Sequence, residues 1–321
     1  MNVLVTGGAG YIGSALVERL VGEGHGVVSI DNLSRGDYEC LVKYRESPRL
    51  KLVVGDICDS KKLEGVLREG GGVSAIAHLA AVPGIERCQR NPKEAILTNI
   101  YGTYAVLEIA RKYDVDRLVF ASSAAVYGSP IRAPIGEDHP LSPTNLYGVT
   151  KLAAEGLLES YHASYGLGTV ILRFGNVYGV GVYTHWETVI PKFVRQALSE
   201  QALTIYGDGK QSRDFIRVWD VVEAVILALK GERGVVAGEN FNVGVGKATS
   251  VNVIADTVSR IFYAEYGKKV GTVNLPPRRG ETCVPNFCYS IAKIGGKLRF
   301  KPELSIEKDV KQLVTYGMEN S

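Results

Sequence analysis

The chain of 321 residues has no uninterrupted apolar run long enough to span a bilayer, so the sequence does not predict a membrane protein. It also has no excess of either charge, because 37 Lys and Arg residues stand against 34 Asp and Glu residues, and the basic residues are scattered. This pattern gives no reason to expect a nucleic-acid surface. No signal sequence is expected before the first strand. We therefore expect a cytoplasmic globular protein of one large or two ordinary domains.

Cysteine is scarce and lacks metal-binding spacing. The five cysteines are an odd number, and the only near pair, Cys283 and Cys288, has no histidine beside it. Extracellular disulfide frameworks and zinc sites both need regular spacings that are absent here. The sequence predicts reduced thiols and no metal site.

Glycine, in contrast, is concentrated where the chain begins. A short apolar run, Val3 to Val5, leads into T-G-G-A-G-Y-I-G, and a helical pattern starts at Tyr11. Strand, tight turn and helix are the context in which such a glycine cluster binds a dinucleotide. Gly7 permits the turn, Gly10 lets the backbone approach a diphosphate, and Gly13 lets the helix pack on its strand. A glycine-rich turn without any ligand is the alternative interpretation.

An acidic residue at the end of the next apolar run favours the dinucleotide. Asp31 follows Gly13 at about the twenty-residue spacing expected of a carboxylate that binds ribose hydroxyls. Such a carboxylate repels a 2′-phosphate, so the sequence predicts NAD rather than NADP. Arg35 is the opposing feature, since an arginine near this turn is how a 2′-phosphate is accommodated.

Apolar strand patterns alternate with helical ones through the first half of the chain. We expect strands near residues 3–5, 27–31, 52–54, 75–79, 118–121 and 169–172, and helices beginning at Tyr11 and near residues 61–68, 95–113 and 147–165. This alternation indicates a Rossmann-type α/β fold, a doubly wound parallel sheet with right-handed crossovers. Ligands of such sheets bind beyond the carboxyl ends of the strands. The residues at these ends are Asp56 and Ile57, Leu79 to Ala81, and Ser122 and Ser123. Asn99 lies in the helix that follows the fourth strand.

The character of the chain changes near Gly175, where glycine, aromatic and charged residues become mixed. Helices are expected near 191–199, 221–229 and 251–266, with a last one beginning at Ser305. We therefore predict a dinucleotide-binding domain over 1–174 and a smaller α/β substrate lobe over 175–321. Segments near 214–243 are expected to pack back on the first domain.

A tyrosine and a lysine four residues apart open the helix near 147–165. Tyr147 and Lys151 share one helix face, and Ser123 ends the preceding strand. A tyrosine with its ordinary pKa of about 10 is a poor base at neutral pH. A nearby ammonium and a positive nicotinamide ring both favour the phenolate, so we expect Lys151 to lower the pKa of Tyr147. The alternative is a Tyr/Lys pair on an ordinary amphipathic helix.

Taken together, these motifs resemble the extended short-chain dehydrogenases/reductases, and among them the NAD-dependent nucleotide-sugar epimerases and dehydratases, with UDP-glucose (UDP-galactose) 4-epimerases as the most similar group. The matching segments are T-G-G-A-G-Y-I-G at 6–13, D-N-L at 31–33, G-D-I at 55–57, H-L-A-A at 78–81, S-S-A-A-V-Y-G at 122–128, Y-G-V-T-K at 147–151, R-F-G-N-V-Y-G at 173–179 and R-D-F-I-R-V-W-D at 213–220. The resemblance implies bound NAD, a UDP-sugar substrate in the C-terminal lobe, and a homodimer formed through helices near 95–113 and 147–165.

The residues implied for each role follow from these motifs. The resemblance implies Ser123, Tyr147 and Lys151 as the catalytic set. The residue pattern and the resemblance together predict contacts to NAD from Gly7, Gly10, Tyr11, Ile12, Gly13, Asp31, Asn32, Leu33, Ser34, Gly36, Asp56, Ile57, Leu79, Ala80, Ala81, Asn99, Ser122, Tyr147, Lys151 and Val177. Substrate contacts are implied for Ser123, Asn176, Val189, Tyr206, Arg213, Arg278 and Glu281. Two arginines suit a diphosphate, although each could instead form a surface ion pair.

Several departures from the family pattern bear on the reaction and the sugar. Ala125 stands where many relatives carry threonine, and the region that gates N-acetylated sugars falls near 285–287, beside a small insertion after Glu281. Dehydratases carry an Asp-Glu pair just before V-Y-G and decarboxylases an acidic residue, whereas this chain has Ala124 and Ala125. Elimination needs these extra proton-transfer groups. The sequence therefore predicts a 4-epimerase of UDP-glucose and UDP-galactose. The enzymatic alternatives are a 4-epimerase of UDP-N-acetylglucosamine or UDP-glucuronate, and a dehydratase or decarboxylase. The non-enzymatic alternative is an NAD-sensing scaffold protein.

Overall fold

Alternating side chains of the first strand divide the core into two layers. In the computed structural model, which describes residues 1–277 and 286–319, Val3 and Val5 of β1 (Asn2–Thr6) are buried in one hydrophobic cluster and Leu4 in another. Successive strand residues point to opposite faces of a sheet, so β1 is covered on both sides. The run of consecutive apolar residues Val3 to Val5 is thus explained by the position of β1 inside the sheet, where both of its faces are buried.

Seven strands form the large sheet, in the order β10-β6-β5-β4-β1-β2-β3, and every pairing is parallel. The remaining strands of this sheet are β2 (Gly26–Asp31), β3 (Leu50–Val54), β4 (Ala75–His78), β5 (Arg117–Ser123), β6 (Thr169–Phe174) and β10 (Glu239–Val243). The sheet confirms the predicted fold class. β10, from the second half of the chain, pairs with β6.

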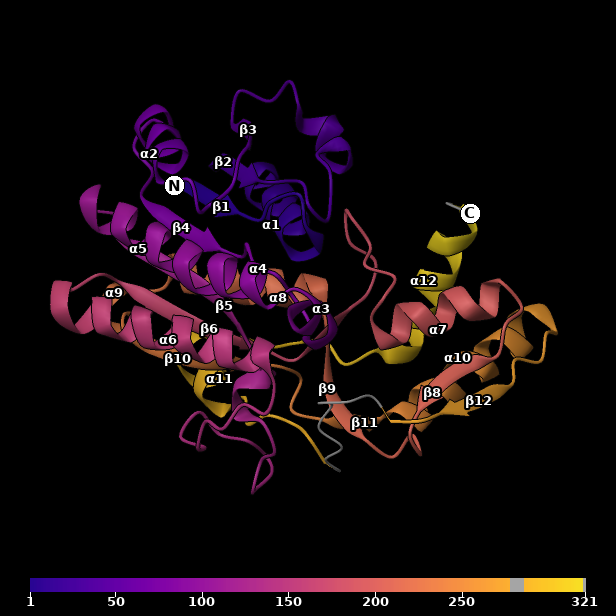
Figure 1. Ribbon diagram of the computed structural model, residues 1–321. Coiled ribbons are helices and arrows are strands. Elements are labelled where there is room, and N and C mark those ends of the chain that lie inside the picture. The colour runs from indigo at the N-terminus through magenta and orange to yellow at the C-terminus, as the bar shows by residue number, and fades with distance from the viewer. Residues whose placement is uncertain (278–285, 320–321) are drawn as a thin grey trace.

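Helices cover both faces of this sheet (Figure 1). One face packs on α1 (Tyr11–Gly22), α8 (Val218–Lys230) and α11 (Ala292–Leu298), and the other on α2 (Ser60–Glu69), α5 (Gly102–Lys112) and α6 (Leu146–Tyr165). Short helical segments complete this part: α3 (Ile85–Arg90), α4 (Pro92–Ile96), α9 (Arg233–Val236) and 3₁₀ turns at Glu39–Tyr44 and Ala124–Tyr127. The helix α8 and the strand β10 lie within 214–243, the segment expected to pack back on the first half.

A wider turn interrupts the helix expected over 95–113. Between α4 and α5 the chain forms a π-helical turn, Leu97–Tyr101, in which the Gly102 amide donates to the Leu97 carbonyl five residues back. The Thr103 hydroxyl donates to the Asn99 carbonyl at 2.7 Å, and the Asn99 side chain is hydrogen-bonded to other segments. Such turns occur where a helix side chain is redirected. The extra residue per turn cannot be read from apolar periodicity.

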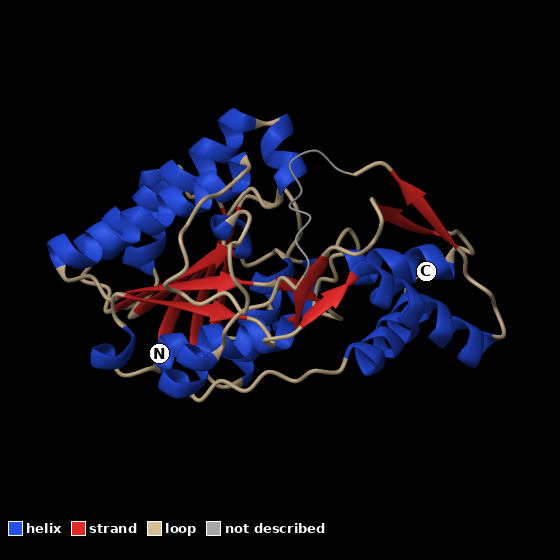
Figure 2. Cartoon of the chain, turned by 90° about the horizontal axis from the view of Figure 1, so that it is seen from below, coloured by secondary structure: helices blue, strands red, loops and turns tan. Residues whose placement is uncertain are grey.

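The second half of the chain adds two small sheets and a helical layer, which lie to one side of the large sheet (Figure 2). β7 (Asn176–Tyr178), β9 (Ser212–Arg217) and β11 (Ala248–Ser250) form one sheet, and β8 (Leu203–Tyr206) pairs with β12 (Thr272–Leu275). The helices α7 (Val189–Leu198), α10 (Val251–Tyr266) and α12 (Ile306–Glu319) share a third hydrophobic cluster. Sequence periodicity indicated these three helices, whereas the short, mixed strands of this half carry too little alternation to be predicted. No described helix is long and apolar enough to cross a membrane.

Candidate functional site

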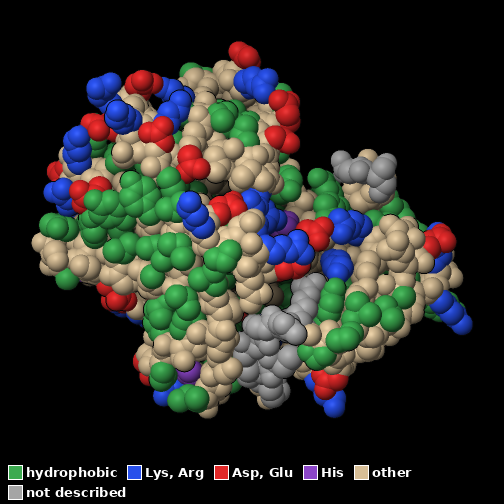
Figure 3. Space-filling model, in the orientation of Figure 1, with side chains coloured by type: hydrophobic (Ala, Val, Ile, Leu, Met, Phe, Trp, Pro, Cys, Tyr) green, Lys and Arg blue, Asp and Glu red, His purple; other side chains and the backbone are tan. Residues whose placement is uncertain are grey.

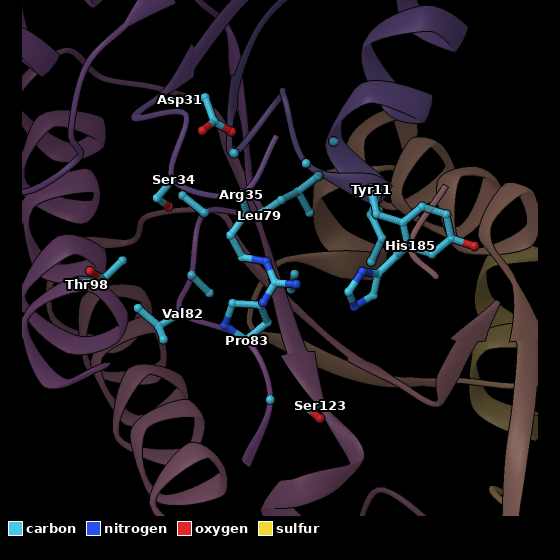
Figure 4. Close-up of a pocket in the computed structure, with 18 of the residues that line it drawn as sticks. Tyr11, Asp31, Ser34, Arg35, Leu79, Val82, Pro83, Thr98, Ser123 and His185 are labelled. Atoms are coloured by element: carbon cyan, nitrogen blue, oxygen red, sulfur yellow. The ribbon is translucent and has the colours of Figure 1, made fainter. Parts of the chain in front are cut away.

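A cavity of about 440 Å³ opens at the carboxyl ends of the parallel strands, where this fold binds its ligands. The first half of the chain supplies strand-end residues to its lining, and the segment from Gly175 to Thr188 supplies the opposite wall. Figure 4 shows Tyr11, Asp31, Arg35, Ser123 and His185 around this space. The cavity therefore lies between the two halves of the chain.

Its floor is the glycine turn between β1 and α1. Gly7 has φ of +77°, and a Cβ added to it would lie 2.7 Å from the Ala80 amide nitrogen. A Cβ on Gly13 would lie 2.0 Å from the Gly7 carbonyl oxygen, so only glycine allows α1 to start this close to the turn. Gly10 caps the helix with extended backbone, which leaves the first amides of α1 available for an anion. These residues fit the diphosphate of a dinucleotide.

Carboxylates that follow β2 and β3 line the next part of the cavity. The Asp31 oxygens accept hydrogen bonds from the amides of Ala9 (3.0 Å) and Leu33 (2.8 Å), which fixes the carboxylate at the cavity wall. Asn32 donates to Asp56 at 2.9 Å. Burial acts to raise the pKa of Asp56, but hydrogen bonds from the Cys58 amide and Asn32 outweigh it and hold the pKa below its usual value. Both acids are therefore positioned as hydrogen-bond acceptors.

Ser123 and Tyr147 meet on the other side of the cavity. β5 ends at Ser123, and the Asn145 side chain caps α6 so that Tyr147 lies in its first turn. Both side chains line the cavity. Burial raises the pKa of the Tyr147 phenol to about 12, while its interaction with Ser123 acts in the opposite direction. Burial therefore opposes formation of the phenolate, and the contact with Ser123 favours it.

Lys151, which is expected to lower the pKa of Tyr147, does not line the cavity. Its ammonium donates to the Ala121 carbonyl at 2.8 Å and lies 4.7 Å from the centroid of the Phe120 ring. Burial lowers the pKa of Lys151 to about 8. That the Lys151 ammonium favours the Tyr147 phenolate stays a prediction.

Four other residues predicted to contact the cofactor are not among those that line the cavity. The Asn99 side chain is hydrogen-bonded to the backbone of Val82 and to the Thr150 hydroxyl, and it thereby fixes the loop after β4. Ser122 donates to the buried Glu155 carboxylate. Leu33 and Gly36 belong to the loop that packs on the glycine turn, and neither lines the cavity. The other predicted cofactor residues line it: Gly7, Gly10, Tyr11, Ile12, Gly13, Asp31, Asn32, Ser34, Asp56, Ile57, Leu79, Ala80, Ala81, Tyr147 and Val177.

The predicted substrate residues are spread more widely. Asn176 lines the cavity, while Val189, which begins α7, does not. Tyr206, at the end of β8, has the Lys192 ammonium 5.4 Å from its ring centroid, and Arg213 of β9 lies 5.7 Å from that of Phe287. Neither lines the cavity. Arg278 and Glu281 fall outside the described residues, as does residue 285 of the expected gate.

Sequence reasoning missed two groups of lining residues. Val82, Pro83 and Gly84 follow β4 and could have been found by extending the strand-end rule past Ala81. Tyr183, His185 and Thr188 precede α7, and only the tertiary structure brings them over the cavity. Glu94, Thr98, Ala124 and Arg35 also line it. Among the described residues, no three His, Cys, Asp or Glu side chains are grouped as metal ligands.

A glycine turn between a strand and a helix, a carboxylate at the end of the next strand and a Ser-Tyr pair beside one cavity are the arrangement of an NAD-dependent short-chain oxidoreductase scaffold. Residues 3–244 match the NAD dependent epimerase/dehydratase family, and the chain belongs to that family. It is therefore an NAD-dependent nucleotide-sugar epimerase or dehydratase, which confirms the predicted cofactor.

Individual relatives differ in the reaction that their names give. A putative UDP-glucose 4-epimerase of Methanocaldococcus jannaschii is 36% identical, with 99% of both chains covered. A dTDP-glucose 4,6-dehydratase of Haemophilus influenzae is 31% identical, with 100% of this chain and 99% of the relative covered. Among solved structures, a UDP-glucose 4-epimerase of Thermotoga maritima with UDP-glucose superposes with a TM-score of 0.89 at 33% identity, covering 100% of this chain and 99% of the other. Sequence and structural similarity to these relatives do not by themselves distinguish an epimerase reaction from a dehydratase reaction.

Proposed function

We propose that the chain is a 4-epimerase of a UDP-hexose, acting on UDP-glucose and UDP-galactose through a transient 4-keto sugar. The observation that carries this proposal is Ala124, which lines the cavity beside Ser123 and Tyr147 and has no group that can give or take a proton. Elimination of the 6-hydroxyl needs an acid and a base in addition to the tyrosine. Oxidation and re-reduction at C4 needs only one acid/base.

The remaining acids of the cavity are engaged elsewhere. The described acids that line it are Asp31, Asp56 and Glu94. Asp31 and Asp56 accept hydrogen bonds from backbone amides, and Glu94 forms an ion pair with Arg87 at 3.1 Å. None of the three is a free general acid, which supports epimerisation over dehydration.

Each residue of the proposed site has a defined task. Tyr147 takes the proton from the sugar 4-hydroxyl and later returns it, and Ser123 hydrogen-bonds the reacting oxygen. Lys151 holds the start of α6 against the end of β5 through Ala121. When bound, NAD supplies the reversible hydride transfer at C4. The small side chain of Ala124 leaves room for the keto sugar to turn between the two transfers.

Deuterated water distinguishes the candidate reactions. With UDP-glucose we expect UDP-galactose that carries no carbon-bound deuterium by NMR, because the hydrogen at C4 never exchanges with solvent. A 4-keto-6-deoxy product with deuterium at C6 would identify a dehydratase, and carbon dioxide from UDP-glucuronate a decarboxylase. Parallel reactions with UDP-N-acetylglucosamine and UDP-glucuronate determine which sugar is preferred, and the Tyr147→Phe variant serves as the inactive control.

A homodimer through α5 and α6 is part of the proposal. Hydrophobic side chains gather over these two helices in Figure 3. Large apolar residues of this region are substantially exposed: Ile96 (47%), Leu97 (44%), Tyr101 (44%), Tyr104 (42%) and Val149 (46%). Contiguous exposed apolar side chains mark interaction surfaces. A second copy of the chain would cover them.

A further inference from the structure

Arg35 extends into the cofactor cavity without a partner. It lines the cavity and is partly buried, and its guanidinium makes no hydrogen bond or ion pair with any residue within 1–277 or 286–319. Figure 4 shows the side chain leading away from the Asp31 carboxylate and toward the level of His185. A guanidinium carries a permanent charge and five donors. Partial burial of such a group is unfavourable unless an anion is bound nearby.

The groups that face Arg35 do not supply that anion. Burial lowers the pKa of Arg35, and the neighbouring Arg87 lowers it further, whereas Tyr183 and Glu187 act weakly in the opposite direction. Glu187 is already paired with Arg195 at 3.0 Å, and Arg87 with Glu94. Burial and the charge of Arg35 also lower the pKa of His185, so this histidine stays neutral near pH 7. An uncompensated positive charge therefore faces the cavity.

The loop that carries Arg35 is fixed to the glycine turn. A Cβ on Gly36 would lie 2.1 Å from the Ala9 carbonyl oxygen, so the loop is in direct contact with the turn. Leu33 has φ of +58°, and its amide donates to Asp31 at 2.8 Å. The base of the Arg35 side chain is thus held in a constant position relative to the first amides of α1.

We propose that the Arg35 guanidinium binds the diphosphate of NAD from the side opposite the start of α1. The amides of α1 bind the diphosphate at the helix N-terminus, and the forked guanidinium of Arg35 binds its other oxygens. The two contacts enclose the diphosphate between them and slow the release of the cofactor. This inference concerns the cofactor alone and does not depend on the sugar or on the epimerase reaction.

Two other phosphates have the same chemistry. The diphosphate of the nucleotide sugar is one, but the backbone of the Arg35 loop contacts the glycine turn that is expected to bind the dinucleotide. A 2′-phosphate of NADP is the other, but it would lie beside Asp31, from which the Arg35 side chain leads away. The structure therefore favours the diphosphate of the dinucleotide, and the experiment distinguishes all three.

The test compares Arg35→Met and Arg35→Lys with wild type and with Arg45→Met, which removes an exposed arginine that is paired with Glu39 at 3.0 Å. NAD released by denaturation is quantified, and exchange of bound NAD against radiolabelled NAD is timed. We expect exchange to accelerate about tenfold or more in Arg35→Met, by a smaller factor in Arg35→Lys, and not at all in Arg45→Met. Higher salt should accelerate exchange in wild type more than in Arg35→Met.

Two further measurements determine which phosphate Arg35 binds. UDP is titrated by calorimetry into the NAD-loaded proteins, and NADP competes for the cofactor site. Unchanged UDP affinity and unchanged preference for NAD over NADP support the proposal. The proposal would be overturned if NAD exchanged at the same rate in all variants. It would also be overturned if the Arg35 variants lost affinity for UDP alone, or for NADP alone. Unfolding midpoints exclude global destabilisation, and Arg35→Lys provides the same test if the Met variant does not fold.

Discussion

The ammonium of Lys151 donates a hydrogen bond to the carbonyl oxygen of Ala121 at 2.8 Å. Lys151 lies one helical turn after Tyr147 on α6, and Ala121 lies two residues before Ser123 on β5. This single bond therefore ties together the two elements that carry the proposed reacting groups. It also places the ammonium in a fully enclosed position, with consequences for the stability of the protein.

Lys151→Met is expected to change how stability depends on pH. Because the pKa of Lys151 in the folded chain is about 8, below its ordinary value of 10.5, the folded state loses this proton first. Between these two pH values the unfolded chain binds more protons, so this residue makes the unfolding free energy rise with pH. The wild type should therefore gain stability relative to Lys151→Met from pH 8 to 10.5, as measured by urea unfolding. Parallel pH curves for the two proteins would contradict the assignment.

Tyr147→Phe should abolish most activity while leaving the cofactor bound. Loss of a general acid/base lowers kcat by about 10²–10⁴, and the ring of phenylalanine preserves the packing. Because the pKa of Tyr147 is raised to about 12, we expect wild-type activity to rise with pH wherever deprotonation of the phenol limits the rate. Steady-state kinetics and NAD content are the measurements. Tyr263→Phe, at an exposed position on α10, should match wild type; near-normal turnover in Tyr147→Phe would reject the mechanism.

Glu155→Leu should strongly destabilise the fold. The Glu155 carboxylate of α6 accepts three hydrogen bonds from Arg173 of β6, at 2.7, 3.1 and 3.2 Å, and another from Ser122. Both charged side chains are buried. Removing the acid leaves the buried Arg173 guanidinium without a counter-ion, which costs about 3–5 kcal/mol of unfolding free energy. Denaturant unfolding should show the loss, and the double variant Glu155→Leu/Arg173→Met should recover much of it. If the single variant were as stable as the double, the pair would not be the cause.

Leu97→Asp should weaken the proposed dimer without unfolding the chain. Its side chain is 44% exposed on the apolar surface beside α5, where a charge would be desolvated by a second copy. Sedimentation velocity should show a dimer for wild type and a monomer for the variant. Val253→Asp, 52% exposed on α10, is the matched control and should remain dimeric. A monomeric wild type would exclude this interface.

Local sequence was sufficient to predict the parts of the site that local backbone geometry defines. The glycine turn, Asp31 at the end of β2 and Tyr147 in the first turn of α6 follow from helix and strand periods and from positions where only glycine fits. The parallel sheet was predictable for the same reason, because each strand and helix carries its own pattern. Ser122 and Asn99, which were predicted to contact the cofactor, have buried hydrogen-bond partners from distant segments of the chain that the sequence does not indicate.

Only the tertiary structure decided which side chains meet across the chain. It brings His185 over the cavity from beyond residue 175, pairs β10 with β6, and directs the Lys151 ammonium to the Ala121 carbonyl. It also leaves Arg35 without a hydrogen bond or ion pair within the described residues, although the neighbouring Arg87 is paired with Glu94. These outcomes depend on packing between elements far apart in sequence. Neither hydrophobic periodicity nor motif spacing indicates such contacts, because both describe only residues that are close together in the sequence.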